Sequence, residues 1–216
     1  MSSAIVTAVH DSSAPGAQRF TLPKFGMLVF LASEAMLFAG LIGGYIVLRL
    51  AQGPGNWPPP GAPEIGVKIP PTFLNWVMII NTAILLTSSL TYHWGETRMR
   101  KGGSGLLGYG LTALFGAIFL GVQAWEWLHL KHEGMWLDTY GTYGSCFFTM
   151  TGFHGAHVFL GLLAILLVTW RAILRQMRLF SGQAPTGSHT CEELTGYYWH
   201  FVDVVWIFLY SILYVV

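Results

Sequence analysis

The apolar residues of this chain are gathered into five long hydrophobic segments, which polar connections separate. The segments cover about residues 25–50, 72–93, 105–130, 143–170 and 197–216. Each is long enough for a membrane helix, which needs roughly 20 apolar residues to cross a bilayer. Open strands are excluded inside the bilayer, because lipid offers backbone groups no hydrogen-bond partner. The pattern therefore predicts an all-α, integral membrane five-helix bundle.

The composition agrees with a membrane protein rather than a water-soluble one. Hydrophobic residues make up 53% of the 216 positions and charged residues only 10%, whereas a soluble domain carries about 25% charged residues. The net charge of +1 gives no indication of a nucleic-acid partner. Residues 1–24 are polar and lack the apolar core of a secretory signal. We interpret them as a tail, and residues 25–216 as one transmembrane domain.

The basic residues are unevenly divided between the two ends of the predicted helices. Eight of the 11 lie in the tail and in the second and fourth connections, and three lie on the other side. Cytoplasmic loops carry the excess of Lys and Arg, so we expect the N-terminus inside and the C-terminus outside. Arg171 and Arg175 would then be candidates for contact with lipid headgroups on the inner face.

Pairs of small residues occur at the spacing that brings neighbouring membrane helices together. Such pairs let two backbones approach closely. The pairs are Gly40 with Gly44, Ala117 with Gly121, and Gly152 with Ala156.

Acids and histidines interrupt the apolar segments, where each is costly unless it faces a protein partner. Placed by depth, Glu34, His157 and Asp203 fall in one layer near the middle of the membrane. His154 lies one turn further out, and His200 lies nearer the inner surface. We expect these five side chains to form a buried polar network.

Glu126 and His129 are expected to form a separate polar pair at the outer surface, because they lie three positions apart on one predicted helix.

Two other interpretations of the buried layer remain open on the residues alone. A proton or ion path would use the carboxylates, and a metal or haem site would use the histidines. His154 and His157 could share a metal ion, but no third and fourth ligands follow a recognisable pattern. We therefore favour a structural network, and expect neither a metal site nor a catalytic centre in this chain.

The motifs inside the five segments resemble, in order, those of the subunit III family of haem–copper oxidases. The last segment reads YYWHFVDVVWIFLY, and the fourth reads TGFHGAHVFLG after YGSCFF. The first contributes FGMLVFLASEAMLF, the second NTAILLTSS and the third GVQAWEW. The similarity extends from about residue 20 to 216. Many members have seven helices, so the chain resembles the short, five-helix form.

This resemblance implies an accessory, non-redox subunit of a terminal oxidase, which reduces oxygen to water and pumps protons in aerobic respiration. The haems and copper would belong to subunits I and II, and this chain would hold only structural phospholipids. Subunit I would be the main contact, with subunit II and a small subunit IV as further partners. The chain would stabilise subunit I, bind lipids and support proton uptake.

The family's buried glutamate corresponds to Glu34, its paired histidines to His154 and His157, and its terminal pair to His200 and Asp203. The motifs resemble the cytochrome c branch most closely. A subunit III of a quinol oxidase or of a nitric-oxide-reducing complex is the alternative, and a b-type cytochrome or a proton-conducting protein is less favoured. We expect a bacterial plasma membrane rather than the inner mitochondrial membrane.

Overall fold

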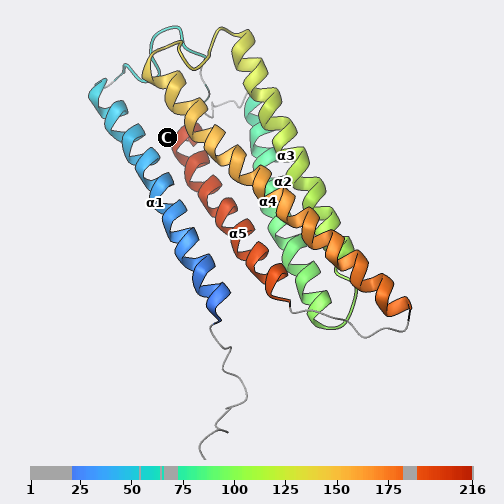
Figure 1. The fold of residues 1–216 in the computed structure, drawn as a ribbon. Coiled ribbons are helices and arrows are strands. Elements are labelled where there is room, and N and C mark those ends of the chain that lie inside the picture. The colour runs from blue at the N-terminus through green and yellow to red at the C-terminus, as the bar shows by residue number, and fades with distance from the viewer. Residues whose placement is uncertain (1–20, 54, 64, 66–72, 182–188, 216) are drawn as a thin grey trace, which may run out of the picture.

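The computed structural model describes residues 21–53, 55–63, 65, 73–181 and 189–215 (Figure 1). It contains five α-helices and, after the last of them, a π-helical turn at Ser211–Val215. The helices are α1 (Leu22–Ala51), α2 (Phe73–Arg100), α3 (Leu106–His132), α4 (Thr142–Phe180) and α5 (Thr190–Tyr210). All five are long and apolar enough to span a membrane, and none of the described residues lies in a strand. The predicted all-α, five-helix membrane fold is confirmed.

Four helix ends lie three or more residues beyond the segments predicted from the sequence, and one of them is the end of α2, at Arg100 rather than 93. α1 begins at Leu22, because Pro23 is well suited to a first helical turn. Residues 22–24 are therefore helical rather than tail, and residues 1–20 lie outside the described residues. α4 continues from the predicted end at residue 170 to Phe180, through a sequence without Gly or Pro. α5 begins at Thr190 rather than 197, with two acidic residues in the turn where the helix dipole favours negative charge.

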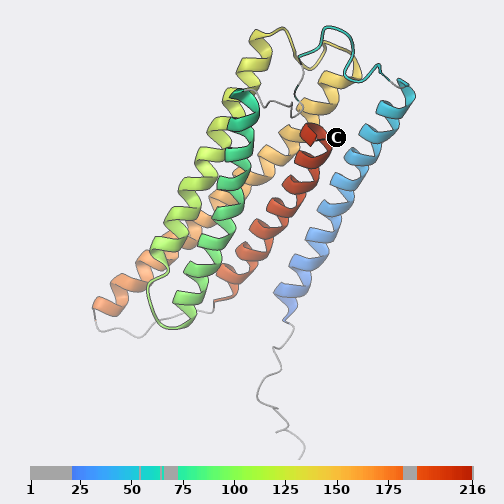
Figure 2. The same ribbon diagram turned by 180° about the vertical axis from the view of Figure 1, so that it is seen from behind.

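The five helices divide into a bundle of four, α2–α5, and one peripheral helix, α1 (Figures 1 and 2). α2 packs on α3, α3 on α4, and α5 on both α4 and α2. α1 lies along α5 and touches α4 less extensively. Phe38 and Tyr45 are its only two buried residues.

Trp199 lies at the centre of the four-helix bundle and is fully buried. Its ring fills the space left by two glycines, since a Cβ at Gly116 of α3 or Gly161 of α4 would come within 2.9 or 2.8 Å of it. Its indole N–H donates to the Ser88 hydroxyl of α2 at 2.9 Å. One side chain of α5 therefore fixes the positions of the three other helices.

α2 and α3 approach one another at backbone distance through Gly95 and Gly108. A Cβ on Gly108 would lie 2.5 Å from the Cα of Gly95. Small residues are what allow such contacts between membrane helices.

Candidate functional site

The first part of the predicted polar network joins α1 to α4. The Glu34 carboxyl Oε2 lies 2.9 Å from Nε2 of His157. The other ring nitrogen, Nδ1, lies 2.7 Å from the Phe153 carbonyl, which can only accept, so Nδ1 carries a proton. The proton between Glu34 and His157 can reside on either partner, and the pair has no net charge in both states. Such a pair can remain in a membrane at less cost than an isolated charge.

The second part joins α5 to α2 through one hydroxyl group. Ser89 donates its proton to Oδ2 of Asp203 in a short hydrogen bond. The hydroxyl oxygen of Ser89, Oγ, also lies 2.9 Å from Nδ1 of His200. Because the hydroxyl proton is already used, Ser89 accepts here and His200 donates. Asp203 and His200 therefore share a partner that the sequence analysis did not identify.

The predicted layer is thus two separate groups rather than one network. Among the described residues, no hydrogen bond joins the Glu34–His157 pair to the group around Asp203. His154 belongs to neither group, since it is 1% exposed and stacks on the Trp206 ring with 4.7 Å between centroids. Depth along a helix was predicted from the sequence, but the direction in which each side chain points was not.

The expectation of a Glu126–His129 pair at the outer surface is wrong. Glu126 is fully buried and accepts hydrogen bonds from Tyr214 at 3.0 and 2.9 Å and from Gln123 at 2.6 Å. His129 points elsewhere, with Nε2 3.4 Å from a carboxylate oxygen of Glu133. Three positions along a helix leave a rotation of about 60° between two side chains. That rotation separates a side chain in the core from one at the surface.

The predicted lipid-contacting arginines lie in different surroundings. Arg175 approaches Nδ1 of His189 at 3.0 Å and Oε1 of Glu192 at 3.9 Å, so it is engaged inside the protein. Arg171 is exposed. Together with Arg178, these arginines and Glu192 line a cavity of about 200 Å³. Contact of Arg171 and Arg175 with lipid stays a prediction.

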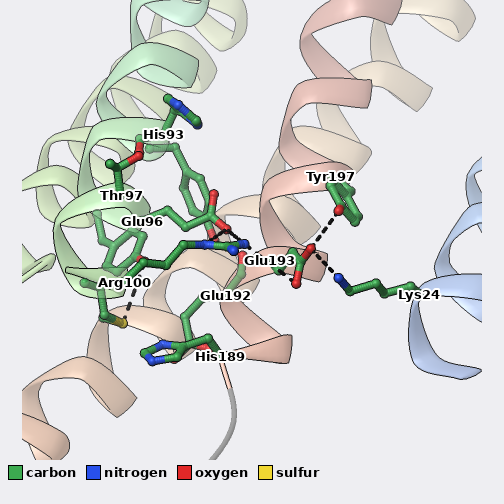
Figure 3. A network of polar contacts seen from close by, with 12 residues as sticks. Lys24, His93, Glu96, Thr97, Arg100, His189, Glu192, Glu193 and Tyr197 are labelled. Atoms are coloured by element: carbon green, nitrogen blue, oxygen red, sulfur yellow. Dashed lines mark hydrogen bonds and ion pairs between the residues drawn. The ribbon is translucent and has the colours of Figure 1, made fainter. Parts of the chain in front are cut away.

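An ion-pair cluster at the end of the bundle where α1 begins was missed by the sequence analysis (Figure 3). Lys24 of α1 lies 2.6 Å from Glu193 of α5, which also accepts a hydrogen bond from Tyr197 at 2.8 Å. Arg100 of α2 pairs with Glu96 at 2.7 Å and approaches Glu193 at 3.7 Å. The i, i+4 spacing of Glu96 and Arg100 was a usable signal, whereas nothing in the sequence paired Lys24 with Glu193.

The polar groups of the described residues do not form a metal centre. No group of three or more His, Cys, Asp or Glu side chains in that part of the chain could hold a metal ion. Most of the predicted polar residues instead connect one helix to another, an arrangement that fixes helix positions.

Comparison with known proteins assigns the chain to a family. A family model described as cytochrome c oxidase subunit III matches residues 10–216. The cytochrome c oxidase subunit 3 of Thermostichus vulcanus is 42% identical, with 88% of this chain and 85% of the relative covered. The probable cytochrome c oxidase subunit 3 of Nocardia farcinica is 39% identical, with 99% and 95% covered. The subunit 3 of Struthio camelus is 34% identical, with 95% and 75% covered. The chain therefore belongs to the cytochrome c oxidase subunit III family, and is an accessory membrane subunit of that oxidase complex.

Proposed function

We propose that this subunit stabilises the catalytic subunit of a bacterial cytochrome c oxidase and takes no part in electron transfer. The observation that carries the proposal is that acidic side chains within the helices of this chain are hydrogen-bonded to other side chains of the same chain. Glu34 is bonded to His157, Asp203 and His200 to Ser89, and Glu126 to Tyr214 and Gln123. Acidic side chains that are bonded in this way hold neighbouring helices together and make the subunit more rigid.

The partner in this proposal is subunit I, with subunit II and a small subunit IV as further neighbours. Haems and copper reside in subunits I and II. Support comes from the family and from the exposed surface of this chain, which is apolar along α1 and α4. The bacterial relatives support a plasma-membrane location, and their names support cytochrome c as the electron donor.

We further propose that the N-terminus faces the cytoplasm and the C-terminus the opposite side. The distribution of basic residues supports this orientation. Arg171 and Arg175 would then lie at the cytoplasmic surface, near the headgroups of structural phospholipids. In that position the subunit could support proton uptake by subunit I without conducting protons itself.

The test is purification of the complex through an affinity tag on this chain in mild detergent, followed by an absorption spectrum and metal analysis. We expect haem and copper in the complex and neither in the separated subunit. Oxidase depleted of this chain should also lose activity faster during turnover than the intact complex. Haem or copper that remained on the isolated chain would contradict the proposal.

A further inference from the structure

Six side chains in the described part of the chain carry buried polar atoms without a hydrogen-bond partner. Four of these atoms, on three side chains, belong to residues near Phe119 in the four-helix bundle. They are both ring nitrogens of His154, Oδ1 of Asn81 and Oε1 of Gln123. These residues are 1%, 1% and 5% exposed, respectively. Buried polar atoms are nearly always bonded in native proteins, so each of these atoms indicates a partner.

The three residues lie around one residue of α3, Phe119. The Asn81 amide N–H donates to the carbonyl of Phe119 at 3.3 Å. The Phe119 ring meets His154 edge-on at 5.9 Å between centroids and Trp206 at 4.9 Å. Gln123 follows Phe119 by one turn on the same helix, so the two share a face of α3. The unpaired atoms of α2, α3 and α4 therefore lie in one region of the core.

The chemistry of these atoms defines the ligand that would satisfy them. A neutral imidazole offers one N–H donor and one acceptor, and the two amide oxygens only accept. An anion would be repelled by the amide oxygens, and a metal ion would lack ligands in this region. One water molecule can donate its two hydrogens to the two amide oxygens and accept from the imidazole N–H, which leaves only the acceptor nitrogen of His154 unpaired.

We propose that the region between α2, α3 and α4 binds an ordered water molecule. The water accepts a hydrogen bond from the ring N–H of His154 and donates to Oδ1 of Asn81, with its second hydrogen directed to Oε1 of Gln123. Because Gln123 also bonds Glu126, which bonds Tyr214, the water extends this polar group from α4 to the C-terminal turn. His154 would thereby add a polar link from α4 to α2 and α3 to its direct ring contact with Phe119.

The substitution His154→Phe, made in the assembled oxidase, distinguishes a hydrated site from a dry one through the thermal midpoint for release of the subunit. Phenylalanine keeps an aromatic ring beside Trp206 and removes both nitrogens. If water is bound, Asn81 and Gln123 lose their shared partner, and the thermal midpoint for release of the subunit falls by several degrees. In a dry site the substitution removes two unsatisfied atoms, so an unchanged or higher midpoint would overturn the proposal. Phe153→Leu, on the exposed side of the same helix, is the matched control and should leave the midpoint unchanged.

Two further measurements test the proposal, and the first does not depend on the assembly of His154→Phe. The first is a cryo-electron microscopy map of the parent oxidase that resolves other buried waters. It should show a peak within hydrogen-bond distance of both His154 and Asn81, and its absence would overturn the proposal. The second is the double substitution with Asn81→Leu. It should lower the midpoint by less than the sum of the two single effects, since either change alone removes the bridge. Strict additivity would count against a shared water.

Discussion

α1 and the α2–α5 bundle lie in the same membrane but are held in place in different ways. In its most apolar stretch, 6% of the residues of α1 are buried, against 28–44% for the four other helices. The bundle helices interlock around Trp199, whereas α1 lies against the side of the bundle (Figure 2). Polar contacts help to hold α1 in place, among them Lys24 with Glu193, Glu34 with His157, and Tyr45 with Trp57 of the following loop. The bundle helices interlock by shape, whereas α1 combines these polar contacts with a few ring contacts, such as Phe30 with Tyr198 and Phe38 with His157.

The glycines show this difference most clearly. Cβ atoms added to Gly40 and Gly44 of α1 would meet nothing within 4 Å, while one added to Gly108 would collide with the backbone of α2. A glycine pair at helix-packing spacing therefore does not identify the helix face that is packed within the subunit.

The largest effect should follow a substitution at the α2–α3 contact. Gly108→Ala places a methyl group 2.5 Å from the Cα of Gly95, and backbone atoms cannot move aside as a side chain can. We expect a loss of about 3 kcal/mol in the free energy of unfolding, at the upper end for overpacking. Gly44→Ala is the control and should change stability by less than about 0.5 kcal/mol. Thermal release of the subunit measures the effects of both substitutions. Equal effects would contradict the difference drawn between the bundle and α1.

A somewhat smaller loss is expected inside the bundle when Asp203 is removed. Asp203→Ala leaves the half-buried hydroxyl of Ser89 without its acceptor, at a cost of about 1–3 kcal/mol. Asp203→Asn keeps an acceptor oxygen and should recover much of the loss. The structural role fails if Asp203→Ala assembles and resists heat like the parent.

Removal of the contact in the middle of α1 should affect that helix alone. Glu34→Ala deprives His157 of its partner, and we expect a loss of about 1 kcal/mol. Because α2–α5 close on one another, proteolysis should become faster at the ends of α1 and remain unchanged at the α2–α3 turn. Glu34→Gln, which can still bond the ring, is the control, and faster cleavage throughout the subunit would argue against a local effect.

The smallest effect belongs to the ion pair at the start of α1. Lys24→Ala removes one partner of a partly exposed pair, whose contribution is about 0.2–1 kcal/mol. Salt screens such a pair, so the difference between variant and parent in thermal release should shrink as ionic strength rises. A difference that persisted in concentrated salt would point to packing by the Lys24 stem instead.

Most of the fold could be predicted from the sequence, but only some of the hydrogen-bond partners of the polar side chains could. Apolar length sets the number of membrane helices, so all five could be predicted. The partner of Asp203 could not, because Ser89 is one of several small hydroxyl residues in α2 and carries no signal of its own. Glu126 was placed wrongly, because its partner Tyr214 belongs to a π-helical turn that helical periodicity does not anticipate. Depth can be read from a sequence, whereas rotation about the helix axis depends on packing.

The central claim, that α1 depends on its polar contacts to stay in place whereas the bundle helices interlock by shape, is tested most directly by spin-label distances in the assembled complex. One pair of labels would replace the exposed residues Met36 of α1 and Leu160 of α4, and the control pair Leu114 of α3 and Phe159 of α4. In the double variant Lys24→Ala and Glu34→Ala, the α1–α4 distance distribution should broaden and the α3–α4 distribution should stay unchanged. An α1–α4 distribution as narrow as that of the parent, or broadening of both, would contradict the claim.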